Sequence, residues 1–258
     1  MAGILPPLAR HISAVKRRLI VIGIALVASF VLTFAYAPDM VAWLKRPFHD
    51  DLIFYGPTEA LFASLKVSLL AGVILTMPVI LYQGWKFIEP ALLPNEQRWA
   101  IPLLGLAAGF FALGLVFCNL VILPLVIQFF VSFGMDRELT PQLAVGTYID
   151  FNVKFLLVFG VAFELPLILT LLARVGVVSS QVLAHYRKHA AMVALILSAV
   201  ITPDATLFTM LLMAVPLIIL YEIGIWGSRL FGRRKVAAEQ GMNLERVTPV
   251  GTAGHRVR

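Results

Sequence analysis

One carboxylate stands alone in a long apolar run. Glu164 lies near the middle of residues 148–174, and no other side chain from Phe155 to Leu172 is ionisable. A helix of roughly 20 residues crosses a bilayer, so this run places Glu164 near half depth. A charge there costs roughly 2.5–3.5 kcal/mol on insertion scales. The group must therefore face other helices or a wet cavity, or stay protonated.

The residues around Glu164 narrow its role. Pro166 removes a backbone hydrogen bond from the preceding turn and leaves a carbonyl for water or a neighbour. Lys154 is ten residues earlier, roughly 15 Å along a helix, and cannot pair with it. We expect Glu164 to face a concave, partly wet bundle surface, where it contacts a polar partner helix or draws water into the bilayer. The alternative is a protonated glutamate bonded to a neighbouring helix for stability.

Other patterns that carry chemistry are missing from the sequence. There is no zinc-ligand spacing, no phosphate-cradling glycine loop and no convincing nucleophile–base pair, and the five histidines are scattered. The single cysteine, Cys118, lies in an apolar run and is expected to fill core space. The sequence therefore predicts no catalytic residue, no metal site, no cofactor and no enzyme.

The composition defines the class of protein. Of 258 residues, 60% are hydrophobic and only 14% are charged, which is typical of an all-α polytopic membrane protein. The formal net charge of +7 would suggest a nucleic-acid partner in a soluble protein. Here the basic residues cluster beside apolar runs, so we expect a bilayer and no nucleic acid.

Six apolar segments are expected to cross the membrane within one domain, residues 1–226. Most of the 21 Lys and Arg residues lie in the head, the inner loops and the tail, which predicts that both termini are cytoplasmic. The fifth segment is short, roughly 21 Å as a helix, and prolines in four segments predict a curved, concave bundle. The tail, 227–258, is expected to be disordered. The expected spans are 19–37, 61–88, 100–130, 150–173, 189–202 and 207–226.

The first outer loop, residues 38–61, carries residues that shape the chain. Pro47 and Pro57 lie within this loop and restrict its backbone. Thr58 can cap a helix start, and Glu59 is favourable in the first turn of that helix. We assign these positions a structural role in the outer loop.

Several short motifs follow one another in order between residues 11 and 226. They are His11-Ile12 with Lys16-Arg17-Arg18-Leu19; Pro57-Thr58-Glu59-Ala60 with Phe62 and Lys66; Pro78, Tyr82-Gln83, Trp85, Phe87, Pro90, Leu92 and Glu96; Tyr148-Ile149, Phe151, Phe159-Gly160, Phe163-Glu164 and Pro166; Arg187; Thr202-Pro203-Asp204; and Pro216 with Leu220-Tyr221-Glu222. In this order and spacing the motifs resemble the TatC family, the multispanning core of the twin-arginine protein translocase.

The resemblance implies a receptor and scaffold in the bacterial cytoplasmic (inner) membrane. Such a protein binds twin-arginine signal peptides of folded proteins at its cytoplasmic face. It works in an oligomeric complex with single-span partners of the TatA and TatB type and uses the proton motive force. The alternative is a proton-coupled small-solute transporter using Glu164, although the other spans offer only Asn119 as a midplane polar group. A purely structural scaffold would not need acids on the inner loop.

The resemblance also implies where a signal peptide binds. Glu96 matches an inner-loop carboxylate that meets its arginines, Phe87 matches the aromatic position beside that loop, and Lys16 and Arg18 match basic positions in the head. The head departs from the family at Ala14, where a glutamate is expected. We hypothesise that Glu89 supplies the second carboxylate. Alternatively, Glu89 pairs with Lys86 or faces water.

A second implied site lies at the outer ends of the fifth and sixth spans. Thr202 and Thr209 place hydroxyl groups there, and Asp204 matches an acidic turn position. The resemblance implies that single-span partners dock at this end. Simple hydrogen bonds between helices are the alternative for the threonines.

Overall fold

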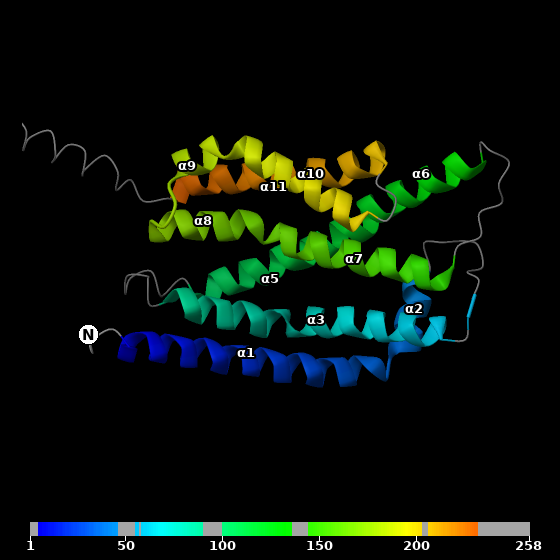
Figure 1. The fold of residues 1–258 in the computed structure, drawn as a ribbon, viewed down its shortest axis with the longest axis horizontal. Helices are drawn as coiled ribbons and strands as arrows, with labels where there is room; N and C mark the ends of the chain where they lie inside the picture. Colours follow the sequence, from blue (N-terminus) through cyan, green and yellow to red (C-terminus); the bar gives the residue numbers. More distant parts are fainter. Residues whose placement is uncertain are drawn as a thin grey trace, which may run out of the picture.

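The computed structural model describes residues 5–45, 55–56, 58–89, 100–135, 144–202 and 206–231. Every regular element in this part of the chain is a helix (Figure 1). The elements are α1 (Leu5–Phe34), α2 (Ala37–Lys45), α3 (Glu59–Ile88), α5 (Ala100–Phe117), the π-helix η2 (Cys118–Ile122), α6 (Leu123–Met135), α7 (Val145–Phe163), α8 (Leu165–Val175), α9 (Ser180–His185), α10 (Arg187–Ile201) and α11 (Leu207–Phe231).

Within the described residues the chain passes six times along the long axis of the bundle (Figure 1). By length and composition, five passes could cross a membrane: α1, α3, α5 with η2 and α6, α7 with α8, and α11. The remaining pass, α10, has 15 residues, about 22 Å of helix. The predicted all-α, polytopic fold is confirmed. Because the number of passes is even, α1 begins and α11 ends at the same end of the bundle (Figure 1).

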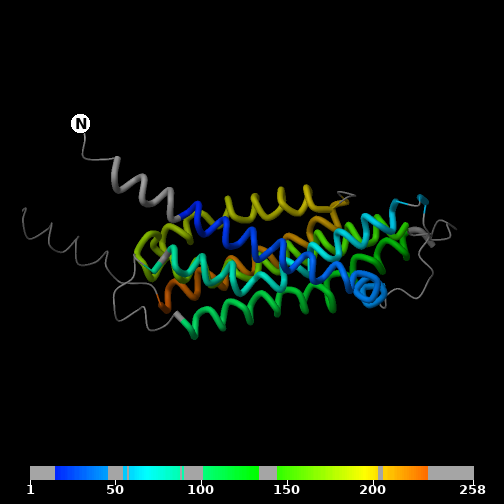
Figure 2. Tube along the Cα trace, turned by 90° about the horizontal axis from the view of Figure 1, so that it is seen from below, coloured from blue at the N-terminus to red at the C-terminus, as the bar shows by residue number. Residues whose placement is uncertain are grey.

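The helices form an open arrangement and do not close into a ring. α1 packs on α3, α3 and α5 pack on α7, and α11 packs on both α8 and α10. In Figure 1, α1 and α10 lie at opposite edges of the layer. Figure 2, turned by 90°, places α5 and α10 on opposite faces. The central helix α7 contributes the largest fully buried side chains, Phe155 and Phe159.

Two passes are interrupted next to a proline. The π-helix η2 ends just before Pro124, and α7 stops at Glu164, just before Pro166. A proline ring collides with the carbonyl four residues earlier and cannot donate a hydrogen bond, so the ladder of helical bonds must change in the preceding turn. Pro78 and Pro216 instead lie inside the uninterrupted helices α3 and α11.

Glycine allows α5 to approach α7 closely. A Cβ atom at Gly114 would lie 2.6 Å from the carbonyl oxygen of Phe159 and 2.9 Å from Cβ of Phe163. In a membrane, lipid tails are as apolar as the side chains, so helices associate through close packing more than through the hydrophobic effect. The absence of a side chain at Gly114 is therefore what lets α5 position the segment that carries Glu164.

The helix ends differ in places from the expected spans. The first long helix ends at Phe34, and a separate helix, α2, occupies residues expected to be loop. The last helix continues to Phe231, because residues after 226 still bury side chains, Ser228 being 1% exposed. An apolar run predicts only the part of a helix that lies in the hydrocarbon core of a membrane. The backbone hydrogen bonds of the helix continue into the polar residues on either side.

Candidate functional site

Glu164 occupies the break between α7 and α8. Its backbone N–H donates to the carbonyl of Val161 over 3.1 Å, and its own carbonyl accepts from Ile168 over 2.9 Å, so the chain turns without losing these bonds. The side chain is only 4% exposed. Oxygen Oε1 is buried and has no hydrogen-bond partner among the described residues. The sequence predicted a concave, partly wet surface, but the carboxyl group is enclosed.

This enclosure is energetically unfavourable by itself. A buried polar group without a partner costs about 1–3 kcal/mol, and more when it is charged. Close beside this group α11 approaches α8, since a Cβ atom at Gly224 would lie 3.2 Å from Cα of Pro166. An ionisable side chain at membrane depth is by default a candidate functional group.

A basic and aromatic cluster lies where α1 enters the bundle and α3 ends. Nη2 of Arg18 donates to the carbonyl oxygen of Lys86 over 2.8 Å. The guanidinium carbon of Arg18 also lies 5.8 Å from the ring centroid of Phe87. A cation at the carboxyl end of a helix satisfies a terminal carbonyl and favours the helix dipole. The contact therefore joins the amino-terminal segment to the end of α3.

The structure describes most, but not all, of the other residues predicted at this site. Phe87 is 58% exposed, Lys16 is exposed and Glu89 is half-buried at the end of α3. The ammonium of Lys86 lies 4.9 Å from the centroid of the Tyr82 ring, and no ion pair joins Lys86 to Glu89 in the described part of the chain. Glu96 lies outside the described residues. The structure brings Arg18 and Phe87 together, with Glu89 two residues further along.

At the opposite end, Glu59 joins α3 to α7. Its Oε2 accepts the backbone N–H of Tyr55 at 2.8 Å, and its Oε1 accepts that of Gly146 at 2.6 Å. Gly146 lies in the first turn of α7, where backbone N–H groups have no helical partner. Lys66 of α3 forms an ion pair with Asp150 of α7 nearby. Glu59 thus joins the starts of α3 and α7 through its carboxylate, a role that its place in the first turn of α3 did not by itself predict. Pro47 and Pro57 lie outside the described residues.

The threonines at this end bond within their own segments. Thr202 donates to the carbonyl of Ser198 over 2.8 Å, and Thr209 donates to the carbonyl of Thr206 over 3.0 Å. Both side chains are buried. These two hydrogen bonds are local to the segment in which each threonine lies. Asp204 lies outside the described residues.

Sequence reasoning missed two other connections. Tyr148 donates its hydroxyl to the carbonyl of Leu44 over 3.0 Å and so anchors α2 to α7. Arg187 at the start of α10 pairs with Glu222 of α11 at 2.9 Å. Both pairs are separated by many residues along the chain, and no spacing signal marks them. Among the described residues, no three His, Cys, Asp or Glu side chains are grouped to hold a metal ion.

Together, the passes and the buried acid define a polytopic helical membrane protein with an ionisable side chain inside its bundle. A family model described as Sec-independent protein translocase protein (TatC) matches residues 10–216. The chain belongs to the TatC family. Membership identifies a component of a protein translocase and not an enzyme, and it does not favour the solute-transporter alternative.

Individual relatives agree with this assignment. The chain is 40% identical over 235 residues to the TatC protein of Aquifex aeolicus, covering 89% of this chain and 97% of the relative. It is 38% identical over 240 residues to that of Desulforapulum autotrophicum, covering 91% and 88%. A crystal structure of the twin arginine translocase receptor TatC matches with a TM-score of 0.80 and 39% identity, over 86% of this chain and all (100%) of the other.

Proposed function

We propose that this protein is the receptor subunit of a twin-arginine translocase. In this proposal it binds the signal peptides of folded proteins at the end of the bundle where α1 enters and α3 ends. That end faces the cytoplasm of a bacterial cell, and the helices cross the inner membrane. Single-span partners of the TatA and TatB type complete an oligomeric complex driven by the proton motive force.

The observation that carries the proposal is the contact of Arg18 with Phe87 and the end of α3. It holds the amino-terminal segment against an exposed aromatic ring. Glu89 lies two residues after Phe87, and Glu96 is seven residues further along the chain. A signal peptide with two guanidinium groups needs two carboxylates and a surface for its apolar part. Glu89 and Glu96 supply the acids, and Phe87 supplies the beginning of that surface.

Glu89 is the second acid because the head lacks one. Ala14 stands where a glutamate is expected from the family. Since the Lys86 ammonium lies against Tyr82, Glu89 is not neutralised by Lys86. A carboxylate at the end of a helix is also disfavoured by the helix dipole, so a cationic peptide that binds there relieves an existing repulsion.

Crosslinking tests this assignment. A photoreactive amino acid is placed at position 91 or 95, next to the two acids in the sequence, of the full-length protein in membranes, and a twin-arginine precursor is added. We expect crosslinks from both positions, and we expect a precursor carrying two lysines in place of the arginines to lose most of them. With the probe at 95, Glu89→Lys should abolish the crosslink, whereas Lys86→Gln serves as a control that also changes a charge at the end of α3. An unaffected Glu89→Lys variant would refute the role of Glu89.

The outer site is proposed as a contact for single-span partners. Thr202, Thr209 and Asp204 lie at or near the junction of α10 and α11, and α10 is shorter than a typical bilayer span. A short helix thins the surrounding bilayer. A thin bilayer favours a partner whose own hydrophobic segment is shorter than the normal thickness of the hydrocarbon core. Cysteine crosslinking from position 206 to a TatA- or TatB-type partner checks this contact.

A further inference from the structure

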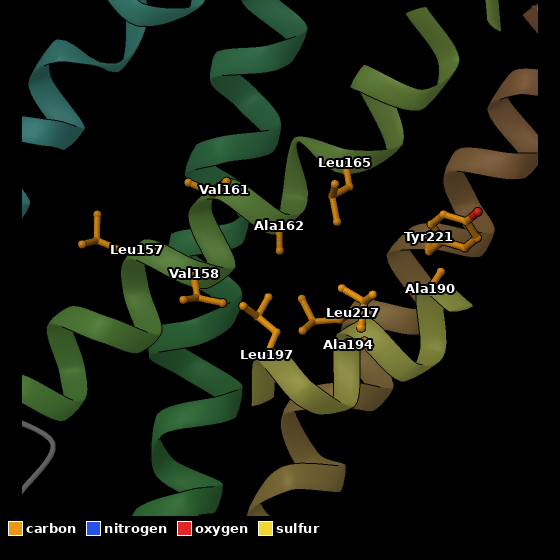
Figure 3. Close-up of a pocket in the computed structure, with 11 residues that line it drawn as sticks. Leu157, Val158, Val161, Ala162, Leu165, Ala190, Ala194, Leu197, Leu217 and Tyr221 are labelled. Atoms are coloured by element: carbon orange, nitrogen blue, oxygen red, sulfur yellow. The ribbon is translucent and has the colours of Figure 1, made fainter. Parts of the chain in front are cut away.

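An apolar groove of about 590 Å³ lies between the α7–α8 segment, α10 and α11 (Figure 3). Its walls are made mostly of aliphatic side chains. In Figure 3, Val158, Ala162 and Leu165 project from one side towards Ala194, Leu197 and Leu217 on the other. The groove is open to its surroundings, because Val193 and Leu197 in its wall are 58% and 44% exposed.

The groove exists because two helices do not meet. α10 packs on α11 and α11 packs on α8, but no substantial packing joins α10 to α7. Small side chains at Ala162, Ala190 and Ala194 widen the space between them. Packed interiors have few voids larger than a water molecule, and an unfilled space forfeits dispersion contacts with its walls. At membrane depth, an apolar chain must therefore occupy it.

One end of the groove carries a cation. Helical periodicity places Arg187 and His189 on either side of the line of Ala190, Ala194 and Leu197. Arg187 lies about one turn before Ala190, and His189 directly precedes it. Nη2 of Arg187 donates to Glu222, which uses one of the five N–H donors of its guanidinium group. The hydroxyl group of Tyr221, by contrast, donates to the carbonyl of Leu183.

We propose that the groove binds one acyl chain of an anionic phospholipid whose phosphate group lies against Arg187 and His189. An acyl chain fits the apolar walls, and the phosphate fits a guanidinium and an imidazole N–H at the end. This proposal does not depend on signal-peptide binding.

The chemistry of the groove favours a lipid chain over a partner helix that carries polar side chains. Ten of its eleven lining residues are aliphatic, and the remaining one is Tyr221, whose hydroxyl group already donates to the carbonyl of Leu183. A polar side chain of a partner would find no hydrogen-bond partner along these walls, whereas an acyl chain needs none.

Native mass spectrometry of the purified full-length protein tests the proposal with two defined lipids. Phosphatidylglycerol or phosphatidylcholine is titrated into the detergent-solubilised protein, and the retained lipid is counted. The parent protein should retain phosphatidylglycerol with about a fivefold preference, because one cation near an anionic lipid contributes about that much. Arg187→Gln should remove the preference. Glu222→Gln breaks the same ion pair but leaves the guanidinium, so it should keep or increase the preference.

A second pair of variants tests the groove itself. Ala194→Phe should reduce retention of both lipids severalfold because the ring fills the space. Ile196→Phe adds bulk on a face of α10 outside the groove and should leave retention unchanged. Ala190→Leu fills less of the groove and provides a milder test should Ala194→Phe fail to fold.

Three results of these titrations would overturn the proposal. The first is equal retention of the two lipids by the parent protein. The second is unchanged retention in both groove-filling variants. The third is an equal loss of preference in Glu222→Gln and Arg187→Gln, which would assign the effect to the ion pair. A partner helix protecting the groove from crosslinking, with no lipid retained, would also contradict it.

Discussion

The guanidinium group of Arg18 lies over the ring of Phe87, with 5.8 Å between the guanidinium carbon and the ring centroid. The same side chain donates to the carbonyl oxygen of Lys86 over 2.8 Å. Through these two contacts α1 holds the end of α3 in place. The position of Phe87, and of the acids that follow it, therefore depends on a residue some 70 positions earlier in the chain.

Replacing Arg18 should loosen this end of the bundle. Arg18→Ala removes a cation–π contact worth about 0.5–1 kcal/mol at an exposed site and leaves the carbonyl of Lys86 without this donor. We expect a lower midpoint of thermal unfolding in detergent and a severalfold loss of signal-peptide binding. Arg17→Ala is the matched control, because it removes the same charge from an exposed neighbour. Equal effects of the two variants would show that only net charge matters.

Glu59→Gln should detach the start of α3 from α7. The carboxylate accepts one backbone N–H on each oxygen, whereas an amide would turn its NH₂ group towards one of those donors. Hydrogen bonds to charged groups contribute about 1.5–3 kcal/mol, so the variant should be measurably less stable. Hydrogen exchange should increase at the amides of Tyr55 and Gly146.

Lys66→Gln is the comparison for this prediction. It breaks the ion pair with Asp150. The side chains of Lys66 and Asp150 are 40% and 38% exposed, and exposed ion pairs contribute only about 0–1 kcal/mol to stability. We expect a smaller effect on thermal unfolding than for Glu59→Gln. The reverse order would show that the ion pair, and not the Glu59 carboxylate, holds the two helices.

Glu164 should matter for export and not for stability. Glu164→Leu removes a buried oxygen that has no partner among the described residues, so the variant should be at least as stable as the parent while losing export. Thermal unfolding and export of a twin-arginine precursor measure the two effects. Glu164→Gln with full export would show that ionisation is unnecessary, and a strongly destabilised Glu164→Leu would assign the residue a structural role.

Gly114→Ala should weaken the contact between α5 and α7. The new Cβ atom would lie 2.6 Å from a backbone oxygen, which cannot move aside easily, and overpacking costs about 1–3 kcal/mol. In Gly109→Ala the Cβ atom would meet open space, so that variant should gain stability from helix propensity, up to about 1 kcal/mol. Opposite changes in unfolding temperature are expected. Similar changes would mean that the close approach is not limiting.

Local patterns in the sequence were enough to predict the helical passes. Apolar runs and the distribution of Lys and Arg depend on the lipid surroundings of each segment, and the break at Glu164 follows from Pro166. The sequence did not predict α2, because a nine-residue helix next to a proline-rich loop carries little periodic signal.

Contacts between residues that are far apart in the chain could not be predicted from the sequence either. Nothing in the spacing of Glu59 indicates Gly146, which lies 87 residues later, because the donor is a backbone N–H that any residue could supply. The burial of Glu164, which is 4% exposed, likewise depends on the packing of segments that are distant in the sequence. Burial at this position is a property of the assembled bundle and not of one helix.

The most direct test of the receptor assignment is the affinity of a twin-arginine signal peptide for the full-length protein and for its Glu96→Gln and Glu89→Gln variants. A matched peptide with two lysines is the reference ligand. We expect the parent to prefer the arginine peptide, and each variant to lose about 1.5–3 kcal/mol of binding, roughly 10- to 150-fold, with little change for the lysine peptide. Unchanged affinity in both variants, or no preference in the parent, would contradict the account.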